Sequence, residues 1–204
     1  MSRPRAKKIK LLILDVDGVM TDGKIYLFPA PAGAQQPLRE EQEKIADKGG
    51  FGFSSDSMVE AKGFNAHDGT GISLARLGGI KTAVITKRIS ETVRLRCRDL
   101  RIDHIYLGIS HKLAAMQEIL AKEGLTAEQA AYLGDDVIDL PPMRACGLAM
   151  AVANARESVK QVAHIVTEHV GGDGAVRDAV EYILKAQGTL DDAVATYIGE
   201  RSPN

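Results

Sequence analysis

The sequence contains little of what marks a membrane protein, a disulfide-rich secreted protein or a nucleic-acid-binding protein. No apolar run approaches the roughly 20 residues that a membrane-spanning helix needs. The basic N-terminus MSRPRAKKIK is followed by only four aliphatic residues, too few for a signal peptide. The formal net charge of −1 indicates no broad basic surface. Tryptophan is absent, and Cys97 and Cys146 lack the spacing of metal ligands. We therefore expect a cytoplasmic protein with reduced core thiols that binds neither membrane nor nucleic acid.

Short aliphatic runs alternate with helical patterns along most of the chain. Strands are expected within IKLLILDVD and in five later runs: Lys81–Thr86, His104–Gly108, Ala130–Asp135, Leu148–Ala153 and His164–Glu168. The segments between the later runs have helical spacing, with Ser or Asp starts and Gly stops. Continuous apolar strands that alternate with helices predict an α/β fold, a doubly wound parallel sheet covered on both faces.

The segment between Asp22 and Asp68 breaks this alternation. GKIYLF and SMVEAKGFNA flank a polar stretch with Gly and Pro, which favours either a β-hairpin over about 23–66 or a disordered insertion. The tip would span about 29–55. Near the other end, GGDGAVRDAVEYILKAQG predicts a Gly-rich turn followed by a terminal helix, and the chain after Thr189 is expected to be loosely held. The whole chain is expected to form one domain.

Polar and charged side chains follow four of the predicted strands. They are Asp15 and Asp17, Thr86, Lys112 at the start of a helix, and Asp135, Asp136 and Asp139. In a doubly wound sheet, ligands bind beyond the carboxyl ends of the strands, so these groups are expected at one edge. Taken alone, the first two aspartates could form a solvated turn, as Asp22-Gly23 is expected to do.

The chemistry that fits this set is phosphoryl transfer through an aspartyl-phosphate. A carboxylate nucleophile divides phosphoester hydrolysis into two easier steps. It can approach an anionic phosphate only if positive charge offsets the repulsion, and Mg²⁺ and Lys112 would supply that charge. The hydroxyl of Thr86 can bind phosphoryl oxygens, and a second carboxylate two residues after the nucleophile can protonate the leaving oxygen.

In this order, the residues resemble the four motifs of the haloacid dehalogenase superfamily of phosphohydrolases: DVDGVMTDG, Thr86, Lys112 and GDDVIDLPPM. The strings DGVMTDGKIYL, KGFNAHDGTGI, YLGDDVIDLPPM and GGDGAVRDAVEYIL extend the resemblance to the small capless branch represented by phosphatases of 3-deoxy-D-manno-octulosonate 8-phosphate. The resemblance implies a Mg²⁺-dependent phosphomonoesterase of that sugar-acid phosphate, or of another ulosonate phosphate such as a nine-carbon one. It also implies a homotetramer in which the β-hairpins meet centrally and neighbouring subunits cover each active site.

The resemblance also implies a role for each matched residue. Asp15 would be the nucleophile and a Mg²⁺ ligand, and Asp17 the general acid/base that binds Mg²⁺ through its backbone carbonyl. Thr86 and Lys112 would hold the phosphoryl group. Asp135 would be the side-chain metal ligand.

Two further aspartates, Asp136 and Asp139, would support the metal or its waters. Their place before Leu140 also makes them candidate helix caps, Asp139 above all, and the two roles are compatible.

Residues near the predicted edge are candidates for substrate contact. Arg88 follows the position where the family often has T-G-R and could bind the sugar acid. Lys87 stands where that pattern has glycine, and it adds bulk and charge beside the site. His67 and His111 are expected near the predicted edge and could touch substrate. Lys87 and the long hairpin tip are the departures from the family pattern, and both bear on the substrate more than on the reaction.

Two other classes of function compete with a phosphatase. A signalling receiver domain uses Asp, Thr, Lys and Mg²⁺ on a similar sheet, but its acidic pair lies on the first strand and its phosphoaccepting Asp on a later one, the reverse of the order here. A non-catalytic oligomerisation domain of the same fold is expected to lose its nucleophile or metal ligand, and Asp15 and Asp135 are both present.

Overall fold

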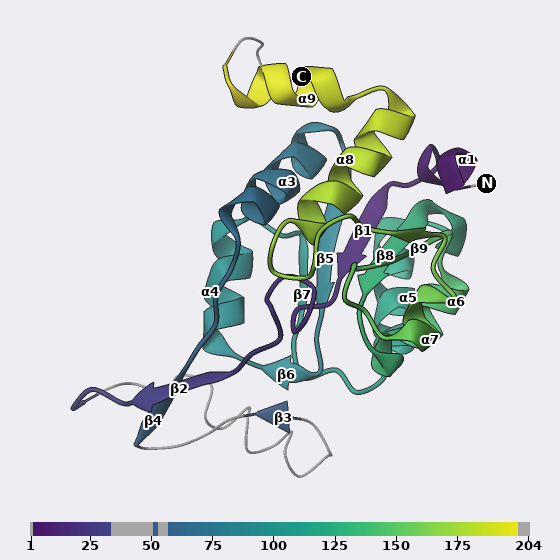
Figure 1. Cartoon of the computed structure of the whole chain (residues 1–204). Helices are drawn as coiled ribbons and strands as arrows, with labels where there is room; N and C mark the ends of the chain where they lie inside the picture. Colours follow the sequence, from purple (N-terminus) through teal and green to yellow (C-terminus); the bar gives the residue numbers. More distant parts are fainter. Residues whose placement is uncertain (1, 34–50, 53–56, 200–204) are drawn as a thin grey trace.

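The computed structural model describes residues 2–33, 51–52 and 57–199. Its centre is a parallel six-stranded sheet with the order β10-β9-β8-β1-β5-β7 (Figure 1). Along the chain the strands are β1 (Leu11–Leu14), β5 (Lys81–Ile85), β7 (His104–Tyr106), β8 (Ala130–Gly134), β9 (Leu148–Ala151) and β10 (Ile165–Val166). The prediction of a doubly wound α/β fold is confirmed.

The strand order places a crevice beside β1. From β1 the chain moves outward through β5 to β7 and then returns to the other side of β1 to form β8, β9 and β10. Leu14 lies opposite Val84 of β5 and opposite Leu133 of β8, so the carboxyl ends of these three strands meet at one edge. Ligands of doubly wound sheets bind where the direction of winding reverses.

The helices cover both faces of the sheet. They are α1 (Ser2–Ala6), α3 (Ala66–Leu77), α4 (Glu91–Asp99), α5 (Lys112–Glu123), α6 (Leu140–Ala145), α7 (Glu157–Lys160), α8 (Ala175–Gln187) and α9 (Leu190–Tyr197), with the short 3₁₀ turns η1 (Ala127–Gln129) and η2 (Val137–Asp139). Helix α3 packs against α8 and α9, whereas α5 packs against α6 on the opposite side (Figure 1). Burial on both faces explains why β1 is wholly aliphatic and why β8 contains no charged residue.

Two helices differ from what the sequence led us to expect. Helix α3 was not anticipated; it begins where the Asn65 side chain accepts the backbone N–H of His67 at 2.7 Å, and it buries Ile72 and Leu74. The chain after Thr189, expected to be loosely held, forms α9, which packs on α3 and α8 and buries Ala193. Residues 200–204 lie outside the described part.

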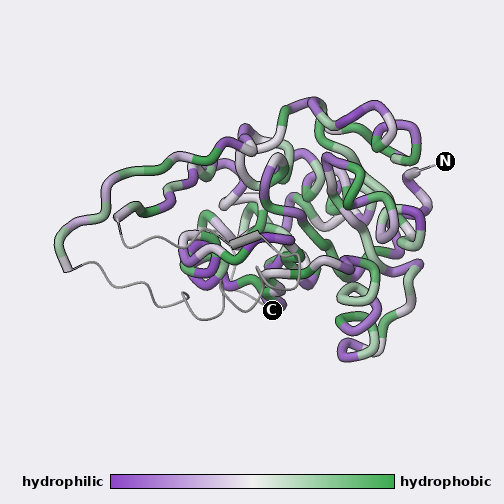
Figure 2. Tube along the Cα trace, turned by 90° about the horizontal axis from the view of Figure 1, so that it is seen from below, coloured by the Kyte–Doolittle hydropathy of each residue, from purple (hydrophilic) through white to green (hydrophobic). Residues whose placement is uncertain are grey.

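The predicted β-hairpin is present as an arm that projects from the body of the molecule (Figure 2). Its strands β2 (Tyr26–Pro29) and β4 (Met58–Ala61) are antiparallel. A second small sheet pairs β3 (Phe51–Gly52) in parallel with β6 (Arg88–Ile89). Most of the expected tip, residues 34–50 and 53–56, lies outside the described residues.

Within the described residues there is no cap domain over the carboxyl edge of the sheet, as expected. None of the described helices has the length and apolar character needed to cross a bilayer. Cys97 and Cys146 are both buried and free, and burial raises the pKa of their thiols to about 12 and about 11. Such thiols are unreactive packing residues.

Candidate active site

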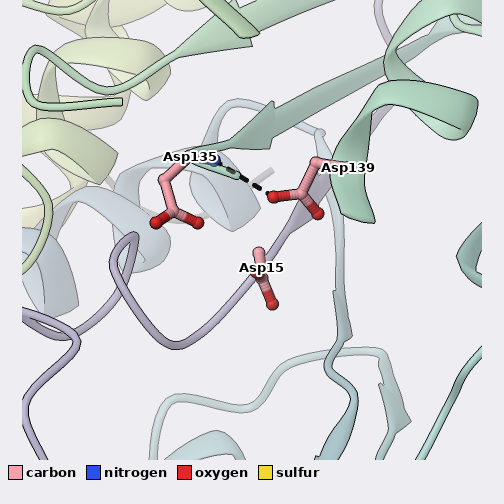
Figure 3. Close-up of side chains that lie close together, drawn as sticks. All are labelled: Asp15, Asp135 and Asp139. Atoms are coloured by element: carbon pink, nitrogen blue, oxygen red, sulfur yellow. Dashed lines mark hydrogen bonds between the residues drawn. The ribbon is translucent and has the colours of Figure 1, made fainter. Parts of the chain in front are cut away.

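Three carboxylates converge at the carboxyl edge of the sheet. Asp15 directly follows β1, Asp135 directly follows β8, and Asp139 ends η2 (Figure 3). One oxygen from each can be chosen so that all three lie within 4.8 Å of one another. Asp15 and Asp139 are buried, and Asp135 is half-buried. Like charges this close are stable only if positive charge or protons compensate them.

A buried lysine provides part of that positive charge. Lys112, the first residue of α5, places Nζ 2.8 Å from Oδ1 of Asp15 and 2.7 Å from Oδ1 of Asp139. Its side chain is almost completely buried. The first residue of α5 therefore places its ammonium at the end of β1, and the lysine predicted at a helix start lies beside the predicted nucleophile.

The side chain of Asp139 is occupied by hydrogen bonds at both oxygens. Oδ1 accepts from Lys112 and from the hydroxyl of Tyr132 at 2.8 Å, and Oδ2 accepts the backbone N–H groups of Asp135 at 3.1 Å and Asp136 at 3.4 Å. The Asp136 side chain is exposed and accepts the N–H of Val137 at 2.7 Å, which caps η2. Both predicted metal supports thus hold the loop after β8, and Asp139 also positions Lys112.

The remaining oxygens fit a hard divalent cation. Oδ1 of Asp135 is buried and has no hydrogen-bond partner among the described residues, which is costly for a carboxylate unless a cation lies beside it. Gly18 has φ +92°, and a Cβ there would lie 2.2 Å from Oδ2 of Asp135, so only glycine allows this close approach. Asp15 and Asp135 could hold Mg²⁺ together with the backbone carbonyl of Asp17.

Burial and mutual repulsion disfavour ionisation of these carboxylates when no metal is bound. Burial first, and then the charge of Asp139, raise the pKa of Asp15 to about 8, although Lys112 opposes the shift. Burial and the charges of Asp139 and Asp136 raise the pKa of Asp135 to about 7. A bound cation favours the ionised forms, so metal binding and loss of these protons are linked.

Asp17 is not one of the three clustered carboxylates, and its side chain contacts two other basic residues. Oδ1 accepts a hydrogen bond from Nζ of Lys62, and Oδ2 lies 3.4 Å from Nε of Arg88. Arg88, predicted to contact substrate, thus reaches the predicted general acid/base. Lys62 was not anticipated from the sequence, because a lysine beyond a short hairpin strand looks like any solvated lysine.

The other predicted residues lie at the same edge or on its flanks. Thr86 is buried directly after β5, and its Oγ1 accepts the N–H of Arg88 at 3.3 Å. The pairing of Leu14 with Val84 brings Thr86 to the same edge as Asp15. Lys87 is half-buried beside it.

The two candidate histidines are exposed. His67 lies in the first turn of α3, and His111 is the residue before α5. None of the polar contacts found in the described part of the chain joins either side chain to the acidic cluster.

The Gly-rich turn before α8 packs against the loop after β1. The N–H of Gly172 donates to the carbonyl of Val19 at 2.9 Å, and a Cβ at Gly171 would lie 1.7 Å from the carbonyl oxygen of Gly18. Asp68 of α3 accepts the N–H groups of Gly174 at 3.2 Å and of Arg177 at 3.0 Å. The loop that follows β1 and carries Asp17 is therefore packed against backbone that only glycine can bring so near.

Comparisons with known proteins agree with this geometry. The family model described as haloacid dehalogenase-like hydrolase matches residues 88–179. The 3-deoxy-D-manno-octulosonate 8-phosphate phosphatase KdsC of Escherichia coli K12 is 40% identical over 189 residues, which cover 93% of this chain and 86% of that protein.

Two solved structures of such phosphatases superpose closely on the chain. That of Moraxella catarrhalis, in complex with magnesium, phosphate and KDO, is 34% identical with a TM-score of 0.79, covering 96% of this chain and 97% of that one. The cobalt-bound form from Haemophilus influenzae is 34% identical with a TM-score of 0.75, covering 91% and 93%. The chain therefore belongs to the haloacid dehalogenase-like hydrolases, within the family of the 3-deoxy-D-manno-octulosonate 8-phosphate phosphatases.

Proposed function

We propose that this protein is a Mg²⁺-dependent phosphomonoesterase that hydrolyses 3-deoxy-D-manno-octulosonate 8-phosphate to the free sugar acid and phosphate. The observation that carries the proposal is Asp15: a buried carboxylate at the end of β1, in contact with Lys112 and close to Asp135. The names of the curated relatives and the sugar acid in the Moraxella structure support the substrate.

In the first step, a carboxylate oxygen of Asp15 attacks phosphorus and forms an aspartyl-phosphate. The bond from phosphorus to the sugar oxygen breaks, and Asp17 gives that oxygen its proton. Lys112 and the Thr86 hydroxyl bind the phosphoryl oxygens during transfer.

In the second step, Asp17 accepts a proton from water as the water attacks the aspartyl-phosphate, which releases phosphate and regenerates Asp15. When bound, Mg²⁺ supplies the positive charge that lets the anionic nucleophile and the phosphate approach each other. Asp15, Asp135 and the carbonyl of Asp17 would hold it. Asp139 keeps Lys112 aligned through both steps.

A homotetramer in the cytoplasm is part of the proposal. The β2 arm projects from the body of the molecule (Figure 2) and carries four consecutive exposed hydrophobic residues, Ile25, Tyr26, Leu27 and Phe28, which a monomer would leave in water. Contact between arms of neighbouring subunits would bury them and help to enclose a site that lacks a cap. The free, buried thiols fit a reducing compartment.

The test of the activity is phosphate release from 3-deoxy-D-manno-octulosonate 8-phosphate, with Mg²⁺ and with chelator, beside a panel of other sugar phosphates. We expect fast, Mg²⁺-dependent release from that substrate above the others. Preferred release from a nine-carbon ulosonate phosphate would keep the reaction but change the assigned substrate, and Lys87 would be the first residue to test for this specificity. No release from any of them would contradict the proposal and favour a non-catalytic oligomerisation domain.

The test of assembly is sedimentation of the wild type and of Phe28→Ser. We expect a tetramer for the wild type and smaller species for the variant. A wild type that sediments as a monomer at micromolar concentration would contradict the tetramer.

A further inference from the structure

A fully buried lysine joins the hairpin to Asp17. Lys62 directly follows β4, and 0% of its side chain is exposed, against 23% for Asp17 and 11% for Glu60. Its ammonium donates to Oδ1 of Asp17 and lies 3.3 Å from Oε1 of Glu60. Lys62 is the first residue of the string KGFNAHDGTGI, but it lies outside the four motifs to which the resemblance assigns catalytic and metal-binding roles.

A buried ammonium is stable only when carboxylates compensate its charge and accept its hydrogen bonds. Lys62 has two such partners, and Arg88 adds a second cation on the other side of Asp17, 3.4 Å from Oδ2. Lysine's four-carbon stem ordinarily reaches solvent. Lys62 instead lies between two carboxylates, which fix its ammonium in place. The Arg88 side chain, by contrast, remains 30% exposed.

The backbone that carries Lys62 is also tied down. Glu60 lies opposite Leu27 in the β2–β4 pairing, and its carbonyl accepts a hydrogen bond from the Thr92 hydroxyl of α4 at 3.4 Å. The base of the hairpin is thereby attached to the helix that follows Thr86. The orientation of the Asp17 carboxyl thus depends on the hairpin as well as on its own loop.

We infer that Lys62 is a positioning residue for proton transfer: it holds Oδ1 of Asp17 so that Oδ2, which faces the half-exposed Arg88, exchanges the proton with the leaving oxygen. This inference rests on the proposed phosphatase activity, in which Asp17 is the general acid/base. Lys62 acts through Asp17 and not by contact with the phosphoryl group.

The test compares two leaving groups in the Mg²⁺-loaded enzyme. A sugar alkoxide needs the proton of Asp17 to leave, whereas 4-nitrophenolate leaves without it. For Lys62→Met we expect the first-turnover release of the sugar to slow by about 100-fold, the usual contribution of general acid catalysis. The first-turnover release of 4-nitrophenolate should change by a few-fold at most, and Asp17→Asn should show the same pattern.

The double variant Asp17→Asn/Lys62→Met decides whether Lys62 acts through Asp17. If it does, the double variant is no slower than Asp17→Asn alone, because residues that act as a unit are not additive. Independent, multiplying losses would overturn the inference, and so would equal losses for both leaving groups. A wild type that releases phosphate from no substrate contradicts the proposed function instead.

Two further variants guard against a change in folding. Lys62→Met alone leaves Asp17 and Glu60 without the cation between them, which can destabilise the fold. The double variant Glu60→Gln/Lys62→Met removes one carboxylate together with the cation. It should show the same leaving-group selectivity as Lys62→Met with a smaller loss of stability. The matched control is Lys24→Met at the base of the other hairpin strand, where an ammonium that is 68% exposed lies 2.9 Å from Asp22. It should leave both rates unchanged; a selective slowing of sugar release in this variant would contradict the assignment to Lys62.

Discussion

Asp139 and Asp15 share the ammonium of Lys112: Oδ1 of Asp139 lies 2.7 Å from Nζ, and Oδ1 of Asp15 lies 2.8 Å from the same atom. The other oxygen of Asp139 accepts two backbone N–H groups of the loop after β8. One fully buried carboxylate therefore fixes both the cation from α5 and the loop that carries Asp135. We therefore expect Asp139 to contribute more to the free energy of unfolding than any exposed aspartate nearby.

Asp139→Asn tests the contribution of Asp139 to the free energy of unfolding. An amide cannot accept at both positions, and it leaves a buried ammonium with one carboxylate fewer, so we expect a loss of about 3 kcal/mol or more in the free energy of unfolding. The measurement is urea unfolding at pH 7.5. Asp136→Asn, which removes charge from an exposed cap, should cost about 1 kcal/mol at most. Equal losses in the two variants would contradict the proposed role.

Asp15→Asn separates catalysis from folding. The amide keeps the size of the side chain but cannot form an acyl phosphate, so turnover should be lost. Because burial and Asp139 already disfavour the ionised form of Asp15, with its pKa raised to about 8, the neutral amide should cost less stability than Asp139→Asn. Phosphate release and urea unfolding are measured on the same samples. Turnover near the wild-type rate would exclude Asp15 as the nucleophile.

Gly18→Ala should weaken Mg²⁺ binding. The new Cβ meets Oδ2 of Asp135 and displaces that carboxylate, so we expect at least about a tenfold loss of affinity in a calorimetric Mg²⁺ titration. Gly79→Ala is the matched control, because Gly79 also has positive φ (+80°) but nothing within 4 Å of its Cβ. It should carry the conformational strain of about 1–2 kcal/mol without a change in Mg²⁺ affinity. Equal affinity in the two variants would mean that the contact with Asp135 does not matter.

His164 should make the protein less stable as the pH falls. Its Nδ1 accepts the N–H of Ala149 at 2.9 Å, which only an unprotonated nitrogen can do. Burial, and then Arg5, lower the pKa of His164 below 6.5. The unfolded chain therefore binds the proton more readily, and stability is lost as the pH falls from above 6.5 through the lowered pKa. Urea midpoints between pH 7.5 and 5 measure this.

His164→Asn keeps an acceptor without the titration and should reduce this loss. His169 provides a comparison of opposite sign, because Asp178 raises its pKa and protonation strengthens that contact. His169→Asn should therefore steepen the loss of stability at low pH. The same slope in all three proteins would contradict both assignments.

The sequence predicted the sheet and most of the residues at its edge, because both depend on local patterns. A strand buried on both faces is predominantly apolar and uncharged, as β1 and β8 are, and charged residues at its carboxyl end stand out against that run. Once the strands are placed, the doubly wound order alone brings Asp15, Thr86 and Asp135 to one edge.

What the sequence could not supply are contacts between segments far apart in the chain. Lys62 is seen to be buried only when the hairpin is folded back beside Asp17. The two hydrogen bonds that Oδ1 of Asp139 accepts come from Tyr132 of β8 and Lys112 of α5, which lie on different elements. The packing of α9 on α3 and α8, which buries Ala193, also joins distant segments, and the chain after Thr189 was therefore expected to be loosely held.

The central position of β1 in the sheet means that this strand lacks its neighbours while the protein is being synthesised. β1 is made before the two strands that flank it: Leu11 pairs with Lys81 of β5 on one side and with Ala130 of β8 on the other. The loop that carries Asp15 is backed only when Gly171 and Gly172 arrive. An incomplete nascent chain therefore holds its most apolar segment without partners, exposed to chaperones and to aggregation. Asp15 precedes the other residues of the candidate site in the chain, yet its loop is completed only after all of them have been made.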